Sequence, residues 1–205
     1  MNTVAIIDYG ICNLDSVARA VEECGGKSVV TDRAEDIETS NRIILPGVGA
    51  FPEAMQNLRL RSLDMILKEQ VLKEHIPFLG ICMGMQLLAT KGWEVEETEG
   101  LGLIPGEVRR LEPFGEDTRI PHIGWNEVHF VRDSPLFEGV ASDKDFYFVH
   151  SYCLCPDEEE DILAQTPYGK GFVSAVQKGL VFGTQFHPEK SQRLGFQVLR
   201  NFLTI

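Results

Sequence analysis

Cys82, His187 and Glu189 have the residue types and the local surroundings of a nucleophile, a base and a carboxylate that orients the base. Cys82 is the centre of a Gly-Ile-Cys-Met-Gly motif (residues 80–84) that follows an apolar run and precedes a helical pattern. This is the form of a nucleophile elbow with cysteine in the serine position. Its glycines allow a tight strand-to-helix turn, and a helix N-terminus stabilises thiolate. A buried structural cysteine at an ordinary turn would have the same local sequence.

His187 is the one of five histidines with an adjacent carboxylate in a suitable context, His-Pro-Glu at residues 187–189. Pro188 pushes the preceding residue toward an extended conformation, in which residues two apart point the same way. We therefore expect Glu189 to orient one ring nitrogen while the other faces the thiol. The His-Pro-Glu motif is short and also occurs in ordinary loops. It indicates a catalytic base only because the same chain contains the nucleophile elbow at Cys82.

Backbone amides for an oxyanion are expected from two places. The turn that holds Gly47, Val48 and Gly49 follows a predicted strand, and Met83 directly follows the nucleophile. An ordinary turn after a strand would also hold glycine. Gln86 lies one helical turn after Cys82, where it could bind a polar substrate, although a surface glutamine would look the same.

The elements that must position these residues alternate between strand and helix in the first half of the chain. Predicted strands at residues 3–8, 27–31, 42–45 and 77–81 are separated or followed by predicted helices at 14–24, 52–58, 63–74 and 83–90. Such alternation predicts an α/β fold with a parallel sheet covered on both faces, whose active site forms at the carboxyl ends of the strands. Predicted strands at 107–111, 127–131, 146–149, 172–177 and 180–185 continue the sheet, partly antiparallel, before a last helix at 191–203.

Composition limits the classes of function. The 205 residues fit a single domain, residues 1–205, and the net charge of −12 disfavours binding to nucleic acid or anionic lipid. No apolar run reaches membrane-spanning length and no signal sequence precedes residue 3, so we expect a soluble cytoplasmic protein. The five cysteines lack the spacing of a disulfide framework and are interpreted as free thiols.

Taken together, these motifs resemble the class I, triad-type glutamine amidotransferases over nearly the whole chain. The class resemblance rests on residues 46–49 (PGVG), 80–86 (GICMGMQ) and 187–189 (HPE). Within the class, the chain most closely resembles the glutaminase subunits of imidazole glycerol phosphate synthase. That likeness rests on residues 8–10 (DYG), 13–14 (NL), 121–126 (PHIGWN) and 148–152 (FVHSY).

The resemblance implies a three-layer sandwich with a mostly parallel central sheet, and hydrolysis of L-glutamine through a thioester on Cys82. His187 would protonate the departing ammonia, amides around residues 47–49 and Met83 would hold the oxyanion, and Gln86 with the backbone of His150, Ser151 and Tyr152 would hold the amino-acid end. Ammonia would pass to a (β/α)8-barrel cyclase subunit in a heterodimer, which forms imidazole glycerol phosphate and AICAR in histidine biosynthesis. No metal or organic cofactor is implied.

Three residues correspond to positions near the partner in such relatives: Asn13, Trp125 and Lys190. Each also has a simpler interpretation, as a helix cap, a core residue and a surface lysine respectively. The sequence departs from its relatives at Cys12, where glycine or another small residue is usual, in a loop expected near the partner.

Three other functions remain open at this point. The first is a glutaminase that serves a paralogous synthase, in cell-surface sugar or pyridoxal phosphate assembly. The second is a free-standing cysteine hydrolase that needs no partner. The third, a catalytically silent binding protein, is disfavoured by the intact set of Cys82, His187 and Glu189.

Overall fold

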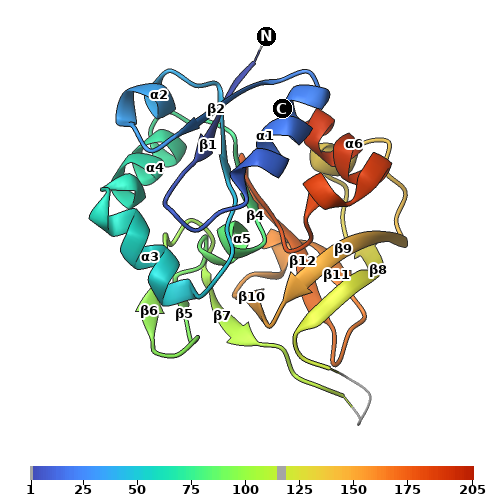
Figure 1. The fold of residues 1–205 in the computed structure, drawn as a ribbon. Coiled ribbons are helices and arrows are strands. Elements are labelled where there is room, and N and C mark those ends of the chain that lie inside the picture. Colours follow the sequence, from blue (N-terminus) through green and yellow to red (C-terminus); the bar gives the residue numbers. More distant parts are fainter. Residues whose placement is uncertain (1, 115–118) are drawn as a thin grey trace.

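A nine-stranded sheet runs through the middle of the protein (Figure 1). The structure is a computed structural model that describes residues 2–114 and 119–205. Neighbouring strands pair in parallel from β2 to β13 and antiparallel from β13 to β9. In sheet order the strands are β2 (Lys27–Thr31), β1 (Thr3–Ile7), β3 (Arg42–Leu45), β4 (Phe78–Ile81), β13 (Val181–Thr184), β12 (Phe172–Lys178), β11 (Ile162–Thr166), β8 (His122–Phe130) and β9 (Lys144–His150).

Two hydrophobic cores lie on opposite faces of this sheet, because successive side chains of a strand point to opposite sides. In β1, Val4 and Ile6 pack in one core with α1 and α6, whereas Ala5 and Ile7 pack in the other with α2, α3 and α4. The protein is therefore a three-layer α/β structure, as the sequence predicts. The helices are α1 (Leu14–Glu23), α2 (Ala34–Glu38), α3 (Phe51–Leu60), α4 (Leu63–Leu72), α5 (Met83–Gln86) and α6 (Gln192–Phe202), with short 3₁₀ turns η1 (Pro135–Phe137), η2 (Glu159–Asp161) and η3 (Pro188–Lys190).

A second, four-stranded sheet adjoins the second core. Its order is β10 (Tyr152–Pro156), β7 (Gly106–Arg110), β5 (Lys91–Gly92) and β6 (Thr98–Glu99). Val108 of β7 and Leu154 of β10 are fully buried in the core that contains α3 and α4. Since β9 and β10 are separated only by Ser151, the chain changes sheets at this residue.

The predictions for some of these elements were wrong. The strand expected at 107–111 belongs to the small sheet and does not continue the large one. The helix expected at 83–90 ends at Gln86, because the carbonyls of Leu87 and Leu88 accept hydrogen bonds from the amides of residues 101, 103 and 104. The short helix α2 and the strands β5, β6, β10 and β11 were not predicted.

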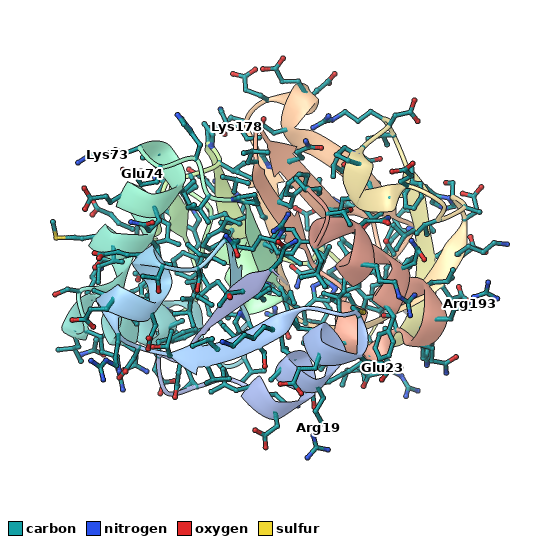
Figure 2. The ribbon with its side chains drawn as sticks, turned by 90° about the horizontal axis from the view of Figure 1, so that it is seen from above. Arg19, Glu23, Lys73, Glu74, Lys178 and Arg193 are labelled. Atoms are coloured by element: carbon teal, nitrogen blue, oxygen red, sulfur yellow. The ribbon has the colours of Figure 1, made fainter. Side chains whose placement is uncertain are left out.

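Charged side chains lie around the outside of the molecule. Figure 2 shows Arg19 and Glu23 of α1, and Arg193 of α6, pointing outward, and all three residues are exposed. Within residues 2–114 and 119–205, no helix is long and apolar enough to cross a membrane.

Candidate active site

Three loops that carry predicted site residues follow three neighbouring parallel strands. Residues 46–49 follow β3, Cys82 follows β4, and His187 lies three residues after β13. β4 pairs with β3 on one side and with β13 on the other, both in parallel. The carboxyl ends of these strands therefore meet at one edge of the sheet, where active sites of open α/β folds form.

Cys82 occupies the strained turn that the motif predicts. Its backbone has φ of 54° and ψ of −108°, a conformation that costs a non-glycine residue free energy and is typical of functional sites. A Cβ at Gly84 would lie 1.7 Å from the carbonyl oxygen of Leu45, so only glycine permits this close approach of α5 to β3. The Cys82 amide donates to the Thr184 carbonyl at 2.8 Å, which ties the turn to β13.

His187 and Glu189 form a buried pair. Nδ1 of His187 lies 2.8 Å from Oε1 of Glu189, and the two side chains are 4% and 2% exposed. His187 is extended, as expected, but the contact arises because Pro188–Lys190 forms the 3₁₀ turn η3, which folds the carboxylate back toward the ring. The contact between His187 and Glu189 was therefore predicted correctly, but the predicted cause, an extended segment with both side chains on one face, was wrong.

The electrostatics of His187 favour a charged imidazole. Burial lowers its pKa, but the negative charges of Cys82 and Glu189 outweigh burial and raise the pKa to about 10. Nδ1 is engaged by Glu189, and Nε2 is buried with no hydrogen-bond partner among the described residues. Nε2 is thus the nitrogen that is free to exchange a proton with a reacting group.

The thiol of Cys82 lies between two polar groups. Its Sγ is 3.7 Å from the Val149 carbonyl oxygen and 3.6 Å from Nε2 of Gln185, which donates to it. Gln185 is fully buried, and its Oε1 accepts from Gln86 at 3.0 Å. Gln185 was missed in the sequence, although its position two residues before His187 on an extended segment was a usable signal.

A cavity of about 250 Å³ opens beside Cys82. Its lining brings together most of the residues that the sequence singled out, and Glu94 is its one carboxylate within residues 2–114 and 119–205. Oε2 of Glu94 accepts from the Phe51 amide at 2.8 Å, which holds the side chain in place. Glu94 was also missed, because a loop carboxylate in an acidic chain carries no distinguishing pattern. The lining residues are Val48, Gly49, Cys82, Met83, Gln86, Glu94, Pro121, Val149, His150, Ser151 and Tyr152.

The four residues expected to hold an oxyanion are not equivalent. Val48, Gly49 and Met83 line the cavity, but Gly47 does not. A Cβ at Gly47 would lie 2.0 Å from the Tyr9 hydroxyl, so this glycine serves close packing. The Val48 amide donates to the Ile11 carbonyl at 3.3 Å and is therefore occupied outside the cavity. Met83 is the first residue of α5, where an amide has no acceptor within the helix.

The residues expected near a partner lie on the surface. Trp125 is 47% exposed, which excludes a core role, and its ring packs edge-on against Tyr147 at 6.0 Å. Nζ of Lys190 lies 5.9 Å from the same Tyr147 ring. Asn13 is exposed at the N-terminus of α1 and makes no side-chain cap. Trp125 and Lys190 thus share a contact residue, whereas Asn13 lies in a separate loop.

Cys12 contacts the turn after β3. Its thiol lies 3.6 Å from the Pro46 carbonyl oxygen and 3.9 Å from that of Ile7. Burial raises the pKa of the Cys12 thiol to about 11, so the neutral thiol is the form that makes these contacts. The loop of residues 10–13 therefore holds residues 46–48 through Cys12 and through the Ile11 carbonyl.

The chain is similar to known proteins over nearly its whole length. Residues 5–205 match the family model described as Glutamine amidotransferase class-I. A protein named imidazole glycerol phosphate synthase subunit HisH from Moorella thermoacetica is 48% identical over 202 residues, 98% of this chain and 94% of that protein. A protein named imidazole glycerol phosphate synthase subunit HisH 1 from Campylobacter jejuni is 47% identical over 202 residues, 97% of this chain and 98% of that protein.

Solved structures with lower identity share the fold. A crystal structure described as glutamine amidotransferase superimposes with a TM-score of 0.74 at 19% identity and covers 98% of this chain and 97% of its own. PurLQS from Thermotoga maritima superimposes with a TM-score of 0.73 at 16% identity, over 100% of this chain and 99% of its own. At these identities the likeness concerns the fold alone.

Proposed function

The chain belongs to the class-I glutamine amidotransferases and, within them, to the HisH subunits of imidazole glycerol phosphate synthase, and on this premise we propose that it hydrolyses L-glutamine to glutamate and ammonia. One observation carries the proposal for the site: Cys82 lies beside the buried His187–Glu189 pair and a cavity in which Glu94 is the single carboxylate among the described residues. The proposed glutaminase domain spans residues 1–205.

In the proposed reaction, Sγ of Cys82 attacks the side-chain amide carbon of glutamine. Cys82 attacks as the thiolate, and the charged His187 gives its Nε2 proton to the departing nitrogen, which leaves as ammonia. Water then attacks the γ-glutamyl thioester and gives a proton to the now neutral His187, so that glutamate is released and the thiolate of Cys82 and the charged imidazole of His187 are restored. Glu189 holds the imidazole with Nε2 facing the reaction and stabilises its positive charge.

The cavity supports an amino acid as substrate. About 250 Å³ is below the roughly 300 to 1,000 Å³ of pockets for drug-sized ligands, so a single small molecule fits better than a peptide. Glu94 provides negative charge for the α-ammonium group. Gln86 adds an acceptor: its Nε2 donates to the Tyr152 carbonyl and to Gln185, which leaves its buried Oε1 without a partner among the described residues.

We assign the oxyanion to amides of Gly49 and Met83, and to Val48 after a change of conformation. Val48 donates to Ile11 in this structure, so its amide must be released before it can serve the site. A donor that is absent until released gives the enzyme a low resting rate.

The proposed partner is the cyclase subunit of imidazole glycerol phosphate synthase, in a heterodimer that passes ammonia between its two chains. Ile123 and Trp125 alternate on β8 and are 60% and 47% exposed, and Val48 beside the cavity is 43% exposed. Exposed apolar side chains this close to a site favour a protein contact there. The proposed pathway, histidine biosynthesis, implies a cytoplasmic location.

The proposal is tested with the complex of this chain and the cyclase subunit, by measuring glutamate and ammonia release. Cys82→Ala should abolish hydrolysis while the folded state remains, since Cys82 contributes little core volume. An electrophilic glutamine analogue should label one thiol, Cys82, and Cys155→Ala, which alters the exposed thiol, should be labelled normally. Labelling at Cys12 or Cys153, or normal hydrolysis by Cys82→Ala, would overturn the assignment.

A further inference from the structure

Two buried histidines that the proposed reaction does not use are His122, at the start of β8, and His150, at the end of β9 and in the lining of the cavity. His122 and His150 face each other in the register of β8 and β9, and they are 3% and 6% exposed. Nδ1 of His122 lies 3.2 Å from Nε2 of His150. Aromatic rings enclose the pair: His122 stacks on Tyr168 with ring centroids 3.9 Å apart, and Phe172 contacts both imidazoles.

The direction of the hydrogen bond between the two imidazoles follows from the groups that each imidazole contacts on its other side. Nδ1 of His150 lies 2.8 Å from the Tyr152 carbonyl oxygen, which can only accept, so Nδ1 carries the hydrogen. In a neutral ring, Nε2 of His150 must then accept, and Nδ1 of His122 donates to it. Nε2 of His122 in turn accepts from Nδ2 of Asn126 at 3.3 Å. The chain of donors therefore runs one way, from Asn126 to Tyr152.

Both imidazoles are neutral at physiological pH. Burial lowers the pKa of His122 to about 4 and that of His150 to about 3. A neutral ring with one hydrogen has one donor and one acceptor, which matches the single direction of the chain. The pair is thus fixed in one tautomeric arrangement and does not compete with His187 for a proton.

This series of hydrogen bonds ends at the Tyr152 carbonyl, which is also the group that orients Gln86. The Tyr152 carbonyl accepts from His150 and also from Nε2 of Gln86, each at 2.8 Å. The second hydrogen of that Nε2 goes to Gln185, whose own amide reaches Sγ of Cys82. With both hydrogens used, Oε1 is the polar atom that the side chain of Gln86, a lining residue of the cavity, has left for a ligand.

We propose that the imidazoles of His122 and His150 are positioning residues for glutamine, which fix the Tyr152 carbonyl and through it hold Oε1 of Gln86 toward the substrate's α-ammonium group. The inference rests on the proposed function, because it requires glutamine in the cavity. Without His150 the Tyr152 peptide loses one of its two donors, and the Gln86 amide loses a fixed acceptor. The cost falls on substrate binding, because Gln86 lies at the amino-acid end and not at the reacting carbon.

The test compares two substitutions at His150 in the complex with the cyclase subunit. His150→Leu removes the donor to Tyr152, whereas the Nδ2 group of His150→Asn can replace Nδ1 as that donor. We expect KM for glutamine to rise about five- to tenfold in His150→Leu, the range for one buried hydrogen bond, with a much smaller change in kcat. In His150→Asn, KM should return to within about twofold of the unsubstituted value.

His122→Phe provides a second variant that keeps the ring stack on Tyr168 but removes both nitrogens. It should raise KM by about two- to fivefold, because His150 keeps its bond to Tyr152 but loses its own donor. In the double variant with His150→Leu, KM should be no higher than in His150→Leu alone, because both residues act through one chain. The matched control is His129→Leu, a partly exposed histidine of β8 outside the chain, which should leave KM unchanged.

Rates are expressed per active site, counted by covalent labelling of Cys82 with the electrophilic glutamine analogue. A purely structural role would lower the count of active sites or the melting temperature without changing KM. Unchanged KM in His150→Leu, or an equal rise in His150→Leu and His150→Asn, would overturn the inference. If His150→Leu does not fold, unchanged KM in His122→Phe overturns it instead. Absence of glutamine hydrolysis in the unsubstituted complex would overturn the proposed function itself.

Discussion

Oε1 of Glu189 lies 2.8 Å from Nδ1 of His187, and both side chains are almost completely buried. A carboxylate can only accept, so Nδ1 carries the hydrogen and Nε2 is the nitrogen available to the thiol. The second carboxylate oxygen of Glu189 is buried without a hydrogen-bond partner in the part of the chain that the structure describes. The negative charge of this carboxylate is therefore poorly solvated and is compensated mainly by the imidazole.

Glu189→Gln should impair turnover less than His187→Ala. The carboxylate orients and stabilises the imidazolium but does not itself transfer the proton, and in a comparable serine-protease triad the loss of the carboxylate costs less than the loss of the base. We expect kcat of His187→Ala to be about 10- to 100-fold below that of Glu189→Gln. Steady-state ammonia release by the complex measures both. Near-normal turnover by His187→Ala beside an inactive Glu189→Gln would reverse the two roles.

The charged state of His187 should make stability depend on pH. Its pKa rises from an ordinary 6.5 to about 10 on folding, so the folded protein holds this proton more tightly than the unfolded chain does. The resulting stabilisation is fully present below pH 6.5 and is lost as the pH rises through about 10. The difference in free energy of unfolding between the unsubstituted protein and His187→Ala should therefore be larger at pH 6 than at pH 10. Urea unfolding at both pH values measures it, and a difference that grows with pH would contradict the assigned charge.

The sequence predicted the strained turn at Cys82 because that turn depends on local rules, and it predicted the His187–Glu189 contact but not the 3₁₀ turn that makes it. Glycine at 84 is needed where α5 approaches β3, and Pro188 begins a turn close to His187. In motifs of this kind the glycine and proline residues themselves restrict the backbone conformation. The parallel half of the sheet was predicted for the same reason, since buried strands such as β4 are uninterrupted apolar runs.

The parts of the site that the sequence did not predict depend on contacts between segments that are distant in the chain. Glu94 reaches the cavity because a loop of the small sheet folds over Phe51, 43 positions away in the chain. Gln86 meets the Tyr152 carbonyl across 66 positions. Neither contact leaves a periodic pattern or a spacing rule, so each residue alone looks like an ordinary surface polar residue until the fold is known.

Glu94→Gln should weaken glutamine binding more than catalysis. The substitution keeps an acceptor for the Phe51 amide but removes the charge that we assign to the α-ammonium group. A hydrogen bond to a charged group contributes about 1.5 to 3 kcal/mol, so KM should rise about 10- to 150-fold. Glu96→Gln, which neutralises an exposed carboxylate of the same loop, is the control and should leave KM unchanged. Equal KM values in the two variants would remove Glu94 from the substrate site.

Gly84→Ala should destabilise the folded state severely. The new Cβ would lie 1.7 Å from the Leu45 carbonyl oxygen, which is backbone and cannot move aside without shifting β3. We expect a loss of at least about 3 kcal/mol in the free energy of unfolding. The control is Gly102→Ala, which has a positive φ of 65° but no atom of the described residues within 4 Å of the added atom, and should lose only about 1 to 2 kcal/mol. Similar losses in the two variants, measured by urea unfolding, would argue against tight packing at the elbow.

Because the Val48 amide is occupied in this structure, we predict that the rate of glutamine hydrolysis depends on binding of the partner. In this structure it donates to the Ile11 carbonyl, and the loop that carries Ile11 also holds Pro46 through Cys12. One oxyanion donor is worth about 3 to 4 kcal/mol of barrier, or roughly 10² to 10³ in rate, so releasing this amide is sufficient as a switch. A ligand can drive the release only by binding the released state more tightly than the resting one.

We therefore expect the isolated chain to hydrolyse glutamine very slowly, the complex with the cyclase subunit to be faster, and the complex loaded with the cyclase's own substrate to be faster by about two to three orders of magnitude than the isolated chain. Cys12→Ala removes the thiol contact to Pro46 and should raise the rate of glutamine hydrolysis by the isolated chain. It should change the rate of the loaded complex little, because the Val48 amide is already released there. Steady-state assays of the three states decide the matter. Full activity in the isolated chain would refute the coupling and favour a free-standing hydrolase, since the Val48 amide would then be available without any partner to release it.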